Sequence, residues 1–190
     1  MAFINLLWRL KNSQPANYDL TPMPDQVSEI FLSASVKRMQ LSEDDINRCL
    51  DKLSEEQMWC RGGDHENSIA NLLLHLEGNL RQWFLHGIDG QPDVRVRDEE
   101  FTLSSSEPCE EIRRRFAATL AESRRVIGSL PPARLLEMIN PQPKGSWGPM
   151  TILEAIYRIV AHLQLHQGQI ILLAKQLTGA DLDLSLPRKR

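Results

Sequence analysis

Hydrophobic residues recur every three to four positions along most of the chain, and this period predicts helices. From Asp25 to about Leu53, apolar residues alternate with charged ones at the spacing of one helix face. The same period returns over 68–87, 107–129 and 151–177. Alternation typical of strands is brief and confined to the connecting segments. The pattern therefore predicts an all-α protein whose four long helices form a four-helix bundle.

Residues typical of helix ends support these segments. Asn67 or Ser68 can cap the second helix, and Gly87 provides a natural end for it. Thr151-Ile-Leu-Glu154 has the spacing of a capping box and would start the last helix. A further capping box, Ser54-Glu-Glu-Gln57, predicts a short helical turn after the first helix.

The four helices predict a single domain with an extension at each end. Residues 1–24 contain three prolines and no sustained hydrophobic period, so we expect an N-terminal arm. Residues 25–179 should form the helical domain, and residues 180–190, which end in a short basic run, a solvated C-terminal tail. A length of 190 residues is sufficient to bury one core without disulfides.

Composition and charge exclude several classes of protein. Lys and Arg number 22 against 25 Asp and Glu, and the pI is about 6.0, far from that of a basic nucleic-acid-binding protein. Basic residues within 107–129 alternate with acidic ones, which predicts a solvated helix face. Cys49, Cys60 and Cys109 form no CxxC pair, which argues against a disulfide framework or a cysteine–zinc site.

The chain also lacks a signal for membrane insertion or export. No apolar run approaches the roughly 18 residues needed to cross a bilayer. The apolar patch at the N-terminus has neither a basic stretch before it nor a small-residue cleavage site after it. We therefore expect a cytoplasmic protein that has neither a membrane nor a nucleic acid as partner.

Two of the five histidines occupy adjacent turns of the last predicted helix. His162 and His166 are four residues apart, which places their Cβ atoms about 5–6 Å apart on one face and lets both imidazoles reach one metal ion. Both lie in the centre of the apolar stripe, beside Ile159 and Ile170, where basic rings are costly to bury unless something binds them. The alternatives are neutral core histidines bonded to nearby carbonyls, or an edge that the bundle leaves exposed.

His75 leads a polar stripe on the second predicted helix. Within about 60° of it lie Ser68, Asn71, Gly78, Asn79, Gln82 and His86. Taken alone, this helix favours a stripe that faces water; the alternative is that the stripe lines a polar pocket facing His162 and His166. A glycine at position 78 is unfavourable by about 1 kcal/mol relative to alanine, so a ligand or another backbone should approach closely there. Gly168, on the back of the last helix, is better explained by close helix packing.

The remaining histidines are not expected at this site. His86 lies about 16 Å from His75 along the helix axis, so one metal cannot bind both, and we expect His86 at the surface or rim. His65 lies in a loop rich in Gly and Asp and should be exposed.

The segments SIANLLLHLEGNLRQWFLHGI (68–88) and TILEAIYRIVAHLQLHQGQIILLAKQLTG (151–179) resemble the DinB/YfiT-like superfamily. The family pattern is a histidine in the second helix and H-x-x-x-H in the last helix, followed by a Gly-Gln-Ile-like segment. Here these positions are His75, His162, His166 and Gly168-Gln169-Ile170. The resemblance covers residues 25–179. It implies a four-helix bundle whose three histidines bind a metal ion, and a homodimer, which is common in the superfamily.

Members of this superfamily differ in activity. They include transferases and isomerases that use low-molecular-weight thiols, proteins assigned as metal-dependent hydrolases, and many without an assigned reaction. The resemblance therefore implies a small-molecule substrate and, for a transferase, a low-molecular-weight thiol as cofactor.

Three neutral histidines on a divalent ion would leave coordination positions open, as is typical of catalytic metal sites. The ion would keep its full charge and could acidify a bound water, polarise a carbonyl or bind a thiolate. Imidazole suits zinc, nickel, copper and iron, and we expect zinc or nickel. Asn79 and Gln82 are candidates for contacts with the ligands or the substrate, unless they are plain solvated residues.

The sequence identifies no general base. Several acidic residues in the connectors could reach the end of the bundle, but no pattern places them there. These are Asp64, Glu66, Asp98, Glu99 and Glu100.

Three functions stay open at this point. If the protein is a metal-dependent hydrolase or a thiol-dependent transferase, each chain should hold one metal tightly beside an open pocket. A metal-binding protein without catalysis predicts the same metal in a closed site. A helical dimerisation module with a vestigial site predicts three histidines without a metal.

Overall fold

The computed structural model describes residues 26–102, 107–141, 143 and 148–184. The expected arm over 1–24 and the end of the expected tail lie outside these residues. The described residues are helical and contain no strand; a single isolated bridge joins Met138 to Thr151. The prediction of an all-α protein is confirmed.

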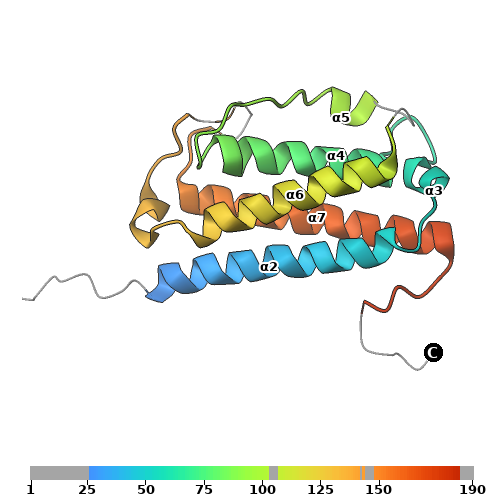
Figure 1. Ribbon diagram of the computed structural model, residues 1–190, viewed down its shortest axis with the longest axis horizontal. Coiled ribbons are helices and arrows are strands. Elements are labelled where there is room, and N and C mark those ends of the chain that lie inside the picture. The colour runs from blue at the N-terminus through green and yellow to red at the C-terminus, as the bar shows by residue number, and fades with distance from the viewer. Residues whose placement is uncertain (1–25, 103–106, 142, 144–147, 185–190) are drawn as a thin grey trace, which may run out of the picture.

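Four long helices pack around one core (Figure 1). They are α2 (Gln26–Leu50), α4 (Ile69–Leu80) with its continuation η1 (Arg81–His86), α6 (Cys109–Gly128) and α7 (Ile152–Thr178). Helices α2 and α4 each pack against both α6 and α7. Among the described residues, no helix is long and apolar enough to cross a membrane.

The second predicted helix is the most buried of the four. Ser68 caps α4 with a capping box in which Asn71 completes the exchange of hydrogen bonds. After Leu80 the helix widens into the π-helix η1, where the Gly87 N–H bonds to the Gln82 carbonyl five residues back. The predicted extent of 68–87 is therefore correct, although its last six residues before Gly87 are not α-helical.

Short elements fill the connections. The capping box at Ser54 is present and starts α3 (Glu55–Trp59), as predicted. The connector after η1 runs back along α4 and contains α5 (Glu99–Thr102), which packs on α4 and which the hydrophobic pattern does not reveal (Figure 1). The 3₁₀-helix η2 (Pro132–Leu136) follows α6.

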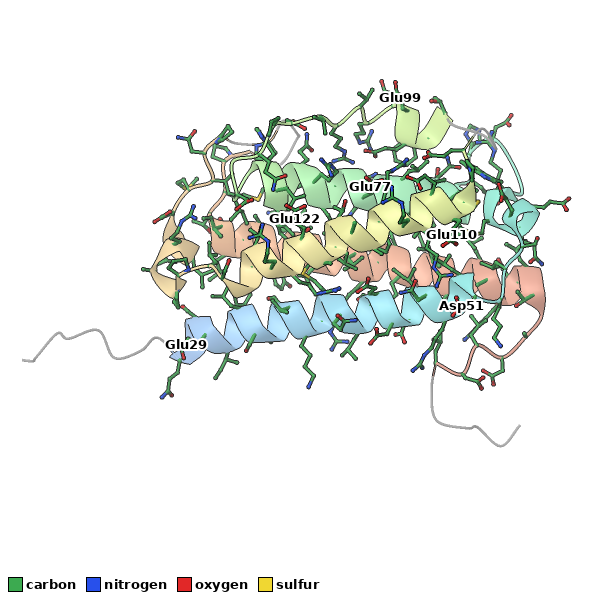
Figure 2. The ribbon with its side chains drawn as sticks, viewed as in Figure 1. Glu29, Asp51, Glu77, Glu99, Glu110 and Glu122 are labelled. Carbon is green, nitrogen blue, oxygen red and sulfur yellow. The ribbon has the colours of Figure 1, made fainter. Side chains whose placement is uncertain are left out.

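Some arginines of α6 bind carboxylates of neighbouring helices and do not simply face solvent. Arg115 donates to Glu77 of α4 and to Glu107, and Arg124 donates to Glu43 of α2. Figure 2 shows Glu77 on α4 beside α6. The predicted solvated face is therefore present only in part: Arg114 and Arg125 are 66% and 61% exposed, whereas the two arginines above join α6 to α4 and α2.

Candidate metal centre

Three histidines from two helices meet at one point. His75 lies on α4, and His162 and His166 lie one turn apart on α7. Nε2 of His162 is 3.1 Å from Nε2 of His75 and 3.0 Å from Nε2 of His166. The three rings therefore lie close enough together for the metal site that the sequence predicts.

The outer nitrogens of two rings face acceptors, which fixes their tautomers. Nδ1 of His75 lies 2.8 Å from Oε2 of Glu100, and Nδ1 of His166 lies 2.6 Å from Oε1 of Gln169. Both acceptors are oxygen atoms that cannot donate, and the contact with Glu100 is shorter than the 3.3 Å between Nδ1 of His75 and Nη2 of Arg95, so we place the hydrogen of each ring on Nδ1. In this tautomer both rings present the lone pairs of their Nε2 atoms to His162.

His162 cannot satisfy both of its neighbours. Its single Nε2 can donate to one lone pair at most, and its Nδ1 is buried without a hydrogen-bond partner among the described residues. A buried polar atom without a partner costs about 1–3 kcal/mol. The cluster therefore has more lone pairs than hydrogens, which is the arrangement that a cation resolves.

The electrostatics keep the two rings of α7 neutral. Burial, together with the neighbouring His166, His75 and Arg95, lowers the pKa of His162 to about 3. Burial also lowers the pKa of His166, although the hydrogen bond to Gln169 opposes this shift. Neutral imidazole is the form that binds metals.

The spacing of the nitrogens fits a common ion. Two atoms that are each about 2.1 Å from one ion lie about 3.0 Å apart at a right angle and about 3.4 Å apart at a tetrahedral angle. One nitrogen from each of His75, His162 and His166 lies within 4.8 Å of the others, so this group could hold a metal ion. By contrast, Nδ1 of His86 donates to the backbone carbonyl of Gln91 in the following connector, 2.6 Å away.

An ion pair that sequence reasoning missed supports His75. Glu100 is 6% exposed and accepts hydrogen bonds from Arg95 at 2.7 Å and 2.9 Å, in addition to its contact with His75. Burial alone would raise the pKa of Glu100, but the hydrogen bonds from Arg95 and His75 hold it below its ordinary value. Gly78 marks the close approach in the sequence, but nothing there distinguishes Glu100 from the other acidic residues of the connectors.

The polar stripe of α4 does not face water. Asn79 and Gln82 are 5% and 9% exposed, and Asn71 is 1% exposed. Gln82 bonds to Arg95 and Asp93, so it belongs to the network behind His75. Oδ1 of Asn79 is buried without a partner among the described residues. Of the two alternatives for this stripe, exposure to solvent is therefore wrong.

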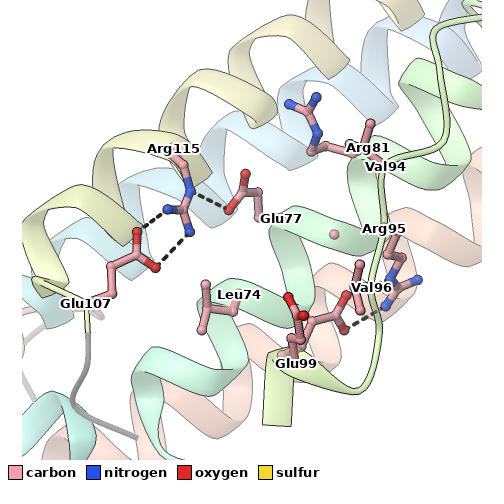
Figure 3. A pocket seen from close by; sticks show the side chains of 11 residues that line it. Leu74, Glu77, Arg81, Val94, Arg95, Val96, Glu99, Glu107 and Arg115 are labelled. Atoms are coloured by element: carbon pink, nitrogen blue, oxygen red, sulfur yellow. Dashed lines mark hydrogen bonds and ion pairs between the residues drawn. The ribbon is translucent and has the colours of Figure 1, made fainter. Parts of the chain in front are cut away.

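The ion pair between Arg95 and Glu100 also lines a cavity of about 340 Å³. Its lining includes Gly78, Arg95 and Glu100 but none of the three histidines. Figure 3 shows Arg115 bonded to Glu77 and Glu107 at one side of this cavity, with Arg95 at the other.

His65 is exposed, as expected, and His86 is half-buried at the end of α4 and η1. Cys49 and Cys109 are buried and Cys60 is exposed. Burial raises the pKa of both buried thiols to about 11, so neither supplies a thiolate near neutral pH.

Comparison with known families identifies a family but no activity. The family model described as "Protein of unknown function (DUF1572)" matches residues 26–190. The match begins where α2 begins. No curated protein matches the chain.

Proposed function

The chain belongs to the DUF1572 family, and we propose that it is a divalent-metal-dependent enzyme with a three-histidine site. The observation that carries this proposal is the convergence of three Nε2 atoms with a surplus of lone pairs. His75, His162 and His166 would hold the ion, for which zinc or nickel suits the imidazole ligands.

A bound ion would supply a Lewis acid that can acidify water or bind a thiolate. The chain's own residues would set the surroundings. Gln169 and Glu100 hold the rings of His166 and His75 by their Nδ1 hydrogens, so that the Nε2 atoms face inward. With three neutral ligands, coordination positions stay free for a small-molecule substrate.

Asn79 is the residue that we assign to substrate contact. It lies one turn after His75 on the same face of α4, and its Oδ1 has no partner among the described residues. An acceptor left free in a buried place favours a ligand that donates a hydrogen bond. Gln82, the other candidate, is already bonded on both sides and has a supporting role.

The reaction class is either hydrolysis or thiol-dependent transfer. In the transfer reaction the nucleophile would be a low-molecular-weight thiol, because Cys49 and Cys109 are buried with raised pKa values. In hydrolysis it would be water. Both reactions need the same open positions at the metal.

We further propose that the helices form a four-helix bundle of the DinB/YfiT type. The supporting observations are the packing of α2 and α4 against both α6 and α7, and the placement of the three histidines on α4 and α7. In this proposal the bundle occupies 25–179, with 1–24 as an arm and 180–190 as a tail.

A homodimer through α7 is also proposed. Tyr157, Leu165 and Leu172 lie on one face of α7 and are 68%, 62% and 57% exposed. Glu154 and Lys175 are exposed at the two ends of the same face. In an antiparallel pair of α7 helices, Glu154 would face the partner's Lys175 and Tyr157 would face the partner's Leu172, which makes the face self-complementary.

The experiment that tests the enzyme proposal is a substrate screen on protein loaded with zinc or nickel. Ester substrates test hydrolysis, and electrophilic substrates offered with low-molecular-weight thiols test transfer. Activity that is lost in His162→Ala and kept in His65→Ala supports the proposal. A loaded protein that is inactive in both screens would favour metal binding without catalysis.

A further inference from the structure

The segment that runs from the end of η1 through α5 is attached to α4 at one place and to η1 at another. At one end, Asn71 of the α4 capping box donates from Nδ2 to the backbone carbonyl of Glu100 at 3.0 Å. At the other end, Nη1 of Arg95 donates to Oε1 of Gln82 at 3.0 Å. Nε2 of Gln82 donates in turn to Asp93, whose other oxygen accepts the backbone N–H of Arg95. Asn71 and Gln82 thus hold the segment along the helix that carries His75.

Within this segment, Arg95 fixes the orientation of the Glu100 carboxylate. The Nε hydrogen of Arg95 reaches Oε1 at 2.7 Å, and an Nη2 hydrogen reaches Oε2 at 2.9 Å. Two parallel hydrogen bonds from one guanidinium leave the carboxylate little freedom to rotate. Both side chains are only 6–7% exposed, so water does not compete for these bonds.

The fixed carboxylate selects one tautomer of His75. Oε2 of Glu100 lies 2.8 Å from Nδ1 of His75, whereas Nη2 of Arg95 lies 3.3 Å from the same nitrogen. The shorter contact is with a carboxylate, which can only accept, so it favours the tautomer with the hydrogen on Nδ1. The ring of Phe101 lies 5.0 Å from that of His75, centroid to centroid, and adds a contact on the ring face. The Nε2 lone pair of His75 is therefore directed at His162.

Gly78 makes room for this carboxylate. A Cβ at this position would overlap Oε1 of Glu100, and it would lie 3.1 Å from Cδ of Glu100 and 3.2 Å from Nε of Arg95. No positive φ requires glycine here, because Gly78 lies inside the regular helix α4. The absence of a side chain at position 78 is what allows Glu100 to lie against α4 beside His75.

From these contacts we propose that Gly78, Arg95 and Glu100 form a positioning unit that sets the metal affinity of the site without touching the metal. Glu100 holds His75 in the tautomer that binds, Arg95 holds Glu100, and Gly78 provides the space. This inference deepens the proposed function, since it rests on the metal site described above. Residues that orient a metal-binding histidine in this way typically change metal affinity or activity by about 10–100-fold when replaced.

The test compares Gly78→Ala and Glu100→Gln with Gly128→Ala. The last variant is a matched control, because a Cβ at Gly128 meets only Val36 at an ordinary 3.8 Å. Zinc affinity is measured by competition with a chromophoric chelator, and the tautomer of His75 by nitrogen NMR of the metal-free protein. We expect affinity to fall about 10–100-fold in the first two variants and to stay within about twofold of wild type in Gly128→Ala.

The NMR measurement separates this inference from the metal proposal. In metal-free wild type, His75 should show a hydrogen on Nδ1 only, and Gly78→Ala should show a mixture of both tautomers. If wild type binds no zinc, the metal proposal fails while the tautomer result still tests the unit. If Gly78→Ala does not fold, Glu100→Gln and Arg95→Gln carry the test. Unchanged affinity and an unchanged tautomer in the folded variants would overturn the inference.

Discussion

Nε2 of His75 lies 3.1 Å from Nε2 of His162, although 87 positions separate these residues in the chain. The contact exists because α4 and α7 pack directly against each other. A metal bound by both would link these two helices, so its loss should be visible in the stability of the whole domain.

Removal of the metal should lower the melting temperature. An ion that binds only the folded state at about 100 times its Kd stabilises by about 2.7 kcal/mol. For a chain of this size that corresponds to a shift of about 5–10 °C. The measurement is a thermal melt of zinc-loaded protein with and without a strong chelator. His162→Ala should melt at the same temperature under both conditions, whereas an unchanged melting temperature in wild type would contradict the prediction.

The metal-free protein should lose stability as the pH falls. The pKa of His162 is about 3 in the folded state because burial disfavours the charged ring, and its ordinary value is 6.5. Between these values the unfolded chain binds a proton that the folded chain does not, so the free energy of unfolding decreases as pH falls below about 6.5. Denaturant midpoints of chelator-treated protein at pH 7.0 to 4.5 measure this slope.

His162→Gln serves as the comparison for this slope. It should show a weaker dependence on pH, because glutamine does not titrate. His65→Gln, in an exposed loop, should match wild type. Equal slopes in wild type and His162→Gln would show that the ring does not titrate as its burial requires.

The cysteines should differ sharply in reactivity. Cys60 is exposed, whereas burial raises the pKa of Cys49 and Cys109 to about 11. The thiolate is the reactive form, so at pH 8 an aromatic disulfide reagent should modify only Cys60 of the folded protein. Release of the aromatic thiol, followed by absorbance, should give one equivalent before denaturation and three after it. Rapid reaction of two or more thiols in the folded state would contradict this.

A charged residue at position 165 should disrupt the proposed dimer. Leu165 is 62% exposed on α7, and a charge there would be buried at the centre of an antiparallel α7 pair. Leu165→Glu should therefore give a monomer by light scattering after size exclusion, while wild type gives a dimer. Ile30→Glu replaces an equally exposed apolar residue on α2 and should leave the dimer intact. A monomeric wild type would remove this proposal.

Much of the fold could be predicted from the sequence because it depends on local periodicity. The hydrophobic period and the capping boxes at Ser54, Ser68 and Thr151 depend on neighbouring residues, and they placed the helices within a few positions. The α5 turn was missed because it is only four residues long and depends on contacts with α4. Local patterns contain no information about such contacts.

The candidate site was predictable only in part. The i, i+4 spacing of His162 and His166 marked one half of it. The polar stripe made His75 a candidate for the other half, and the resemblance chose between a stripe facing water and one facing the other two histidines. Glu100 could not be chosen among the acidic residues of the connectors, because its position depends on Arg95 and on the path of the segment over α4.

The predictions for Gly78 and Gly168, two glycines inside helices, differ in how well the structure supports them. Gly78 does mark a close approach, but by the carboxylate of Glu100, where a backbone or ligand was expected. Gly168 was explained by close helix packing, and this is wrong, because a Cβ there would meet nothing within 4 Å among the described residues. A glycine in a sequence therefore shows only that the position has no side chain. The fold shows whether a neighbouring group needs the room that the missing side chain leaves.

The central claim is that one metal ion sits among the three imidazoles. Anomalous diffraction from crystals of protein purified without a histidine tag, recorded on both sides of the zinc and nickel absorption edges, tests it most directly. We predict one strong peak about 2.0–2.2 Å from the Nε2 atoms of His75, His162 and His166. No peak at this position, even in crystals soaked in zinc, would contradict the account.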